Sequence, residues 1–181
     1  MTRITRTRTL ALAVAAPLAL AAPAVASASG PSSAAVETQR QTIVQIAAGN
    51  EDFETLVKLV KAAGLGTTLS GPGPFTVFAP TDDAFAKVPP ATLKALAKNR
   101  KALRQVLTYH VVPGNVPSTA AIAAARAKKR VKTVEGSTVR LSLRGGNLFV
   151  NAARVVTPDI RAKNGRIHVI NRVIIPPDLA L

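Results

Sequence analysis

Residues 75–85, FTVFAPTDDAF, constrain the fold more than any other stretch of the chain. Residues 75–79 alternate between the two sides of an extended strand. Pro80 has no N–H group to donate, so the strand is expected to end there. Thr81 is a favourable N-cap, and the two aspartates that follow it suit the positive end of a new helix. The sequence therefore predicts a buried strand that turns directly into a short helix.

The length and composition allow one domain with a substantial core. The chain has 181 residues, of which 48% are hydrophobic and only 3% aromatic, so the core is expected to be mainly aliphatic. Cysteine is absent, which excludes disulfides, thiolate metal sites and cysteine nucleophiles. Such a domain must obtain its stability from the core alone.

The first 28 residues have the three parts of a secretory signal peptide. Three arginines precede an apolar run over residues 10–22, and a small-residue cleavage signal ends at Ala28. The apolar run is interrupted by Pro17 and is too short to cross a bilayer. We expect cleavage after Ala28 and a secreted, extracellular product; a retained membrane anchor is the alternative. Loss of the three arginines would lower the formal net charge from +15 to +12.

The rest of the chain is expected to form a disordered spacer over residues 29–40, one domain over residues 41–177 and a short tail over residues 178–181. The spacing of apolar side chains and N-cap residues predicts helices over residues 42–48, 51–63, 82–88, 91–97, 99–110 and 118–130. Ser118 is expected to cap the last of these, an alanine-rich helix that should be exposed and only marginally stable. Residues 65–74 are rich in Gly and Pro and are expected to form a loop.

The second half of the domain favours β-structure. Alternating side chains predict strands over residues 131–134, 138–144, 148–150 and 166–175 and a further strand that starts at residues 154–156, with hairpin turns at residues 145–146 and 164–165. Helices first and strands afterwards predict an α+β fold.

Three motifs in this chain resemble those of the fasciclin domain family. The first motif consists of Thr76, Val77, Phe78, Ala79, Pro80, Thr81, Asp82, Asp83, Ala84 and Phe85. The central pair is Tyr109 and His110, and the second motif contains Gly165, Ile167, His168, Val169, Ile170, Asn171, Val173 and Pro176. The motifs occur in the order and spacing of the family. The resemblance implies a fasciclin-like α+β fold, in which a wedge of two β-sheets carries a cluster of helices along one edge.

Two sets of residues are candidates for catalysis. Acid–base work by Asp82 and Asp83 would require both carboxylates to face one cleft, but neighbours on a helix point about 100° apart, so helix capping is favoured. His110 continues an apolar helix face, and neither metal-ligand spacing nor a Gly-x-Ser-x-Gly sequence is present. We expect His110 and His168 to be buried, hydrogen-bonded structural residues. The resemblance implies that Tyr109 and His110 matter for domain integrity and adhesion.

Asp159 and Ile160 resemble an Asp-Ile pair that is associated with integrin recognition in animal fasciclin domains. Their flanking residues, Thr157 and Arg161, do not keep the acidic and hydrophobic context of that pair. A plain exposed turn is therefore the main expectation here, and an adhesion turn is the alternative. Asn171 stands where many relatives carry Asp, which removes a possible ion pair.

Basic residues are concentrated in one segment that is longer and more basic than is typical of the family. Five of them fall within seven positions: Arg126, Lys128, Lys129, Arg130 and Lys132. Arg140 and Arg144 are expected on the outer face of the next strand. No aromatic residues are interleaved for base stacking, so an anionic polymer is a better partner than nucleic acid. A merely solvated surface is the alternative.

We expect a secreted, monomeric adhesion or binding module of bacterial origin that attaches to cell-surface or matrix polymers, anionic polysaccharides among them. The alternative is an extracellular carrier of a small apolar ligand, held between the helices and the sheets. Neither an enzymatic activity nor a cofactor is expected.

Overall fold

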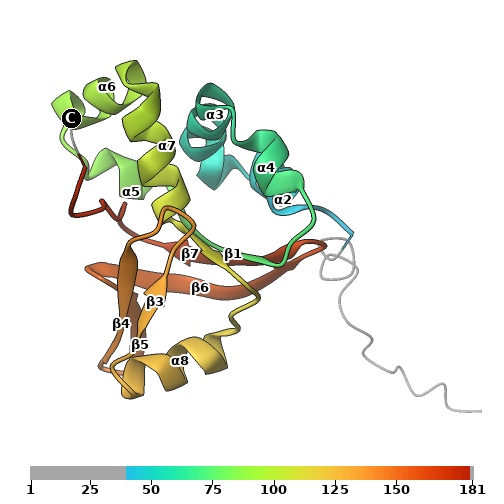
Figure 1. Ribbon diagram of the computed structural model, residues 1–181, viewed down its shortest axis with the longest axis vertical. Helices are drawn as coiled ribbons and strands as arrows, with labels where there is room; N and C mark the ends of the chain where they lie inside the picture. Colours follow the sequence, from blue (N-terminus) through green and yellow to red (C-terminus); the bar gives the residue numbers. More distant parts are fainter. Residues whose placement is uncertain (1–39, 180–181) are drawn as a thin grey trace, which may run out of the picture. The chain divides into compact units, whose positions relative to one another are not determined.

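The computed structural model describes residues 40–179 (Figure 1). The predicted signal peptide, the spacer up to residue 39 and the last two residues of the tail lie outside the described residues. The helices are α2 (Ile43–Ala48), α3 (Glu54–Ala63), α4 (Gly66–Ser70), α5 (Asp82–Ala86), α6 (Pro90–Lys98), α7 (Arg100–Tyr109) and α8 (Ser118–Arg126), with a 3-10 turn, η1 (Glu51–Phe53), before α3. The strands are β1 (Phe75–Pro80), β2 (Val111–Pro113), β3 (Arg130–Lys132), β4 (Thr138–Arg144), β5 (Asn147–Val150), β6 (Ala153–Ala162) and β7 (Gly165–Ile170).

Most helices begin and end at the capping residues that the sequence predicts. The side chain of Thr42 accepts a hydrogen bond from the backbone N–H of Gln45, which in turn bonds back to the Thr42 N–H, so α2 starts with a capping box. Asn99 caps α7 with its side chain alone, which accepts hydrogen bonds of 3.1 Å from two backbone N–H groups. At the other end of α3, Gly64 adopts the left-handed conformation with φ of 69°.

The seven strands form one hydrogen-bonded series that includes both arms of the expected wedge. The seven strands run in the order β2-β1-β7-β6-β5-β4-β3. β1 pairs in parallel with β7, and the other neighbours are antiparallel. β6 belongs to both arms, because its first residues pair with β5 and the remainder with β7. Figure 1 shows the β1/β7 arm crossing the β3/β4/β5 arm, with α2 to α7 on one side of the first arm and α8 on the other. The α+β prediction is confirmed.

Two hydrophobic cores lie on either side of the β1/β7 arm. Val77 and Ala79 of β1 face the core that α2, α3, α4 and α7 share. Phe78 of β1 faces a second core, which contains side chains of α8, β4 and β5. A strand that supplies both cores must be apolar on both sides, which explains why β1 and β7 contain so few polar residues.

Three local predictions were wrong. The predicted loop over residues 65–74 contains α4, because Leu69 is buried and tertiary hydrogen bonds hold the end of that helix. The predicted strand over residues 166–175 ends at Ile170, and the β6–β7 turn falls at residues 163–164 rather than 164–165.

α8 also differs from its prediction. Its N-cap residue is Pro117, and Ser118 makes no cap. Ala121 and Ala125 are buried in the second core, so the helix is attached to the fold by one small-residue face rather than fully exposed. Small side chains allow this helix to approach β4 closely.

Candidate functional site

The first motif builds the scaffold between the two cores. Thr76 is completely buried, and its hydroxyl donates to the Gly114 carbonyl at 2.7 Å and accepts from the Val116 N–H at 2.8 Å. Thr81 caps α5 as predicted. Asp82 accepts a 2.9 Å hydrogen bond from the Thr55 N–H, so its carboxylate caps the first turn of α3. Asp83 is exposed.

The Tyr-His pair connects distant elements. The Tyr109 hydroxyl donates to the Thr138 carbonyl at 3.1 Å and accepts from the Asn151 side chain at 3.0 Å, which joins α7 to the arm of β4 and β5. His110 lies 2.8 Å from the Val106 carbonyl through Nδ1 and accepts from the Ile174 N–H at 3.1 Å through Nε2. Burial lowers the pKa of His110 to about 4, although the Val106 carbonyl acts in the opposite direction. His110 is therefore neutral at pH 7.

The second histidine is also buried in a closed set of contacts. His168 stacks on Phe78 with 5.7 Å between the ring centroids. Its Nδ1 accepts from the Asp159 N–H at 3.2 Å, so the proton resides on Nε2, which donates to the Val116 carbonyl at 2.9 Å. Burial lowers the pKa of His168, with opposing contributions from Val116 and Asp159. Neither histidine has a ring nitrogen available for a substrate or a metal.

The β6–β7 hairpin contains a polar centre that the sequence did not predict. Asn164 is 8% exposed, and its side chain accepts from the Ile43 N–H at 3.0 Å and donates to the carbonyls of Leu69 at 2.7 Å and Gly71 at 3.0 Å. Beside it, Gly165 of the second motif has φ of 154°, and a Cβ there would collide with the Phe75 carbonyl. The local sequence signal for this site is the Asn-Gly dipeptide at residues 164–165, which predicts a turn but none of these hydrogen bonds.

The Asp-Ile pair does not form an exposed turn. Asp159 and Ile160 lie within β6, where the pairing with β7 shifts register, and Asp159 has φ of 64°. The Asp159 carboxylate accepts from the N–H and the hydroxyl of Ser118 and pairs with Arg166 at 2.7 Å. Ile160 packs against the first core. The exposed-turn prediction was wrong because a bulge, rather than a loop, brings Asp159 to the start of α8.

Asn171 keeps a structural role at the end of β7. Its side-chain oxygen accepts from the Arg154 N–H at 2.9 Å, and its backbone carbonyl accepts from Lys87 at 3.1 Å. The first contact holds the end of β7 to β6 beyond the last ladder pair, and the second joins it to the end of α5, without the carboxylate that many relatives are expected to carry.

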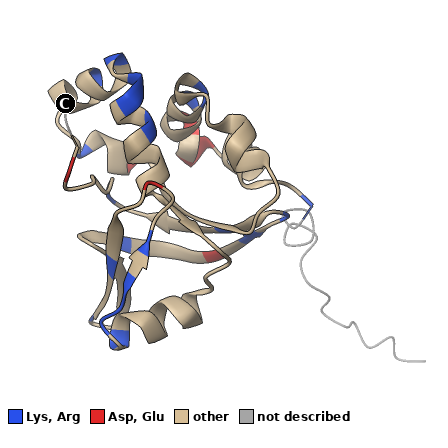
Figure 2. Ribbon diagram, in the orientation of Figure 1, with Lys and Arg blue, Asp and Glu red and all other residues tan. Residues whose placement is uncertain are grey.

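The basic residues form one surface where the end of α8 meets β3 and β4. Seven exposed side chains, which we call the basic surface, are Arg126, Lys128, Lys129, Arg130, Lys132, Arg140 and Arg144. Figure 2 shows blue at the end of α8 and on β3 and β4, with a red segment at the turn that joins β3 to β4. Within residues 40–179 the ion pairs are Lys58–Glu54 and Arg166–Asp159, and neither involves the basic surface. The nearby acid Glu135 accepts hydrogen bonds from Ser137 and Gln105 instead.

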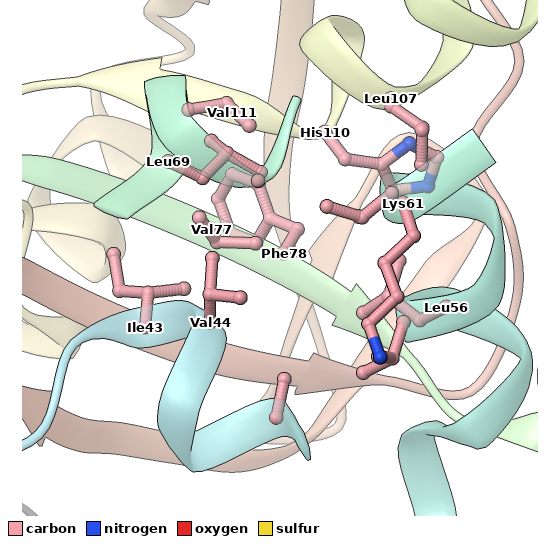
Figure 3. Close-up of a pocket in the computed structure, with 14 residues that line it drawn as sticks. Ile43, Val44, Leu56, Lys61, Leu69, Val77, Phe78, Leu107, His110 and Val111 are labelled. Carbon is pink, nitrogen blue, oxygen red and sulfur yellow. The ribbon is translucent and has the colours of Figure 1, made fainter. Parts of the chain in front are cut away.

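A second candidate site is an apolar cavity between the helices and β1 (Figure 3). It measures about 50 Å³ and is lined by aliphatic side chains of α2, α3 and α4, by Val77 and Phe78 of β1, and by His110. Lys61 of α3 is the one charged side chain in its lining. Both nitrogens of His110 are engaged, so the cavity offers a ligand mainly apolar contact.

In the described part of the chain, no three His, Cys, Asp or Glu side chains are grouped to hold a metal ion. No helix between residues 40 and 179 has both the length and the apolarity needed to cross a bilayer.

Comparisons with known proteins match the motifs and the fold. The sequence model of the fasciclin domain family matches residues 51–176. Protein sll1483 of Synechocystis sp. is 46% identical over 147 residues, covering 80% of this chain and 79% of that protein. The uncharacterized protein sll1735 of the same organism is 48% identical over 133 residues, covering 74% of this chain and 96% of that protein.

The fold is similar to that of a FAS1 domain pair from the insect cell adhesion molecule fasciclin I. That structure aligns with a TM-score of 0.64 and 17% identity, covering 78% of this chain, and this chain spans 53% of the insect one. Taken with the matched motifs, these comparisons show that the chain belongs to the fasciclin domain family.

Proposed function

We propose that this protein is an extracellular adhesion module that binds anionic polymers through the basic surface. The observation that carries the proposal is a group of seven exposed cations that make no ion pair within the described residues. Such a group attracts polyanions by releasing their condensed counterions. Similarity to a domain pair from a cell adhesion molecule supports the same class of function.

A binding role is favoured over an enzymatic one. Both nitrogens of His110 and of His168 contact backbone groups, which leaves neither imidazole as a general base. The Asp159 carboxylate is occupied by Ser118 and Arg166. The motif residues thus serve the fold, and the unpaired charge lies on the surface.

The test compares two triple variants on immobilised alginate, an acidic polysaccharide, across a range of salt concentrations. Lys128→Gln, Lys129→Gln and Arg130→Gln together should lower the salt needed for elution and reduce the slope of log affinity against log salt by roughly one per cation removed. The control removes the same charge from the exposed lysines of α6 and α7: Lys94→Gln, Lys98→Gln and Lys101→Gln. Equal elution of both variants would contradict the proposal.

A second candidate function is the carriage of a small apolar ligand in the cavity of Figure 3. The apolar lining favours it, but a cavity of about 50 Å³ is smaller than the roughly 150 Å³ that admits benzene, so side chains must move for a larger ligand. Binding of an apolar probe such as benzene should be insensitive to salt and should be blocked by Val44→Phe, which fills the cavity. Salt-insensitive binding that survives this substitution would exclude the cavity.

A further inference from the structure

We propose that the polymer lies in a groove between the end of α8 and β4, and that it is a linear acidic polysaccharide. This inference rests on the proposed function and narrows it to one site. The groove, which we call the basic groove, is lined by Arg126 and Lys128 from the end of α8 and by Arg140, Ser142 and Arg144 from β4, with Asn151 beside them. Lys129, Arg130 and Lys132 belong to the basic surface but not to this lining.

The spacing of the β4 cations suits an extended ligand. The residues of β4 that line the groove are the consecutive positions Arg140 to Arg144, so the groove follows the strand along its length. Arg140 and Arg144 lie on the side of the strand opposite the buried Leu141. Four residues along a strand separate the backbone positions of the two arginines by roughly 13 Å. Successive carboxylates of a polymer that runs along the strand can pair with cations spaced in this way.

The backbone at Lys128 has a conformation that favours glycine. α8 ends in a Schellman motif, in which the Lys129 N–H bonds to the Ala124 carbonyl at 2.9 Å and the Lys128 N–H to the Ala125 carbonyl at 3.1 Å. Lys128 occupies the left-handed position of this motif with φ of 53°. Glycine is the usual residue there because a Cβ is unfavourable. Lysine at this position therefore lowers stability while it supplies a cation to the groove.

Like charges also face each other across the adjoining strands. Arg130 of β3 is the register partner of Arg140 of β4, and both side chains are exposed. Like charges in directly opposed positions destabilise an antiparallel pair. An anionic chain in the groove would relieve this repulsion. Two unfavourable features of the free protein thus meet at one groove, where an anionic ligand compensates for them.

The chemistry of the lining favours a polysaccharide over a nucleic acid. None of the lining residues is aromatic, so the groove has no platform for base stacking. Phe149 of β5 is nearby, but the Arg144 guanidinium lies over its ring at 5.4 Å from the centroid. The Ser142 hydroxyl is suited to the hydroxyl groups of a sugar.

The first experiment measures the affinity of the full chain and three double variants for soluble alginate at fixed salt. Arg140→Gln with Arg144→Gln should weaken binding at least tenfold and reduce the salt slope by about two. Lys129→Gln with Lys132→Gln should weaken it less than threefold, and Lys94→Gln with Lys98→Gln should leave it unchanged. Equal losses in the first two variants would overturn the groove but leave the proposed function intact. No alginate binding by the unsubstituted chain would overturn both.

Three further probes test the ligand class: the monomer glucuronate, single-stranded DNA, and vesicles that contain anionic phosphatidylglycerol. Alginate should displace each probe from the groove, and glucuronate should bind at least a hundredfold more weakly than alginate. Groove-dependent binding of DNA or vesicles that is tighter than that of alginate at the same salt would overturn the polysaccharide assignment.

Lys128→Gly separates stability from binding. The substitution should raise Tm by about 2–4 °C, since it relieves the left-handed strain, and should weaken alginate binding about threefold by removing one cation. Saturating alginate should then raise the Tm of the unsubstituted chain more than that of this variant. A lower Tm together with unchanged binding would show that Lys128 serves the fold rather than the groove.

Discussion

The Nε2 atom of His110 accepts a 3.1 Å hydrogen bond from the backbone N–H of Ile174, 64 residues further along the chain. The other ring nitrogen donates to the Val106 carbonyl at 2.8 Å, so the neutral tautomer is fixed. Ile174 follows the last ladder pair of β7 and belongs to the second core. This histidine therefore holds the end of α7 to the segment after β7, where the sheet ladder no longer does so.

Replacing His110 by Ala should destabilise the fold by about 1–3 kcal/mol, because the buried N–H of Ile174 and carbonyl of Val106 lose their partner and a cavity remains. Denaturant midpoints of the variant and the parent give this difference. Lys101→Ala, at an exposed position of the same helix, is the control and should change stability by less than about 0.5 kcal/mol. Unchanged midpoints with lost alginate binding would instead make His110 a contact residue.

Stability should fall on mild acidification. Burial lowers the pKa of His110 to about 4, below its ordinary value of 6.5, and burial also lowers the pKa of His168. Between pH 6.5 and about pH 4, the unfolded chain binds a proton at His110 that the folded chain excludes. The contribution of His110 to folding stability is therefore present above its unfolded pKa of 6.5 and should decline towards pH 4, by up to about 1.4 kcal/mol per pH unit. His168 should add a decline in the same direction.

The pH prediction is measured as the free energy of unfolding in urea at pH 7, 6 and 5, which avoids the range in which the carboxylates titrate. His110→Ala should lose part of the slope, since its remaining decline comes from His168. Equal free energies of unfolding at pH 7 and pH 5 would show that the two histidines take up protons as readily in the folded protein as in the unfolded chain.

Local chemistry explains which features were predictable from sequence. Thr42, Thr81 and Asn99 act through N–H groups two or three residues away, so a cap is visible in the sequence around it. The alternating side chains of β1 and β4 are equally local. The basic surface was also predictable, because five of its seven cations are neighbours in sequence.

Long-range partners explain what the sequence did not reveal. Asn164 contacts the N–H of Ile43 at a separation of 121 residues and the carbonyl of Leu69 at 95, and no local pattern specifies either partner. α4 depends on these contacts, so its prediction as a loop failed for the same reason. The partners of Asp159 are brought together by the bulge in β6. The basic groove required the register of β3 and β4 as well as the course of α8.

Replacing Asn164 by Ala should destabilise the fold by about 2–4 kcal/mol, because one buried N–H and two carbonyls lose their hydrogen bonds at once. Amide exchange of α2 and α4 should accelerate more than that of α7. Asn164→Asp keeps an acceptor for Ile43 but places a charge beside the carbonyls of Leu69 and Gly71, so it should not restore stability. A loss below about 0.5 kcal/mol in the Ala variant would contradict this account.

Replacing Asp159 by Asn should destabilise the fold by about 1–3 kcal/mol, because it leaves the Arg166 guanidinium, whose side chain is only 12% exposed, without its charge partner. Burial alone would raise the pKa of Asp159, but the hydrogen bonds from Ser118 and the charge of Arg166 lower it below the ordinary value. The carboxylate therefore stabilises the folded state above the unfolded pKa, and this contribution should be lost as the pH falls through the lowered one.

Asparagine tolerates the left-handed backbone of residue 159, so this substitution tests the charge and not the conformation. A double-mutant cycle with Ser118→Ala should give a coupling energy of at least about 0.5 kcal/mol, and the amides at the start of α8 should exchange faster.

The Asp159→Asn variant also separates a structural role of Asp159 from a role in adhesion. If Asp159→Asn kept the parent stability while attachment to animal cells was lost, the carboxylate would be a recognition group. If stability falls and alginate binding persists, Asp159 serves to hold the start of α8 against the sheet.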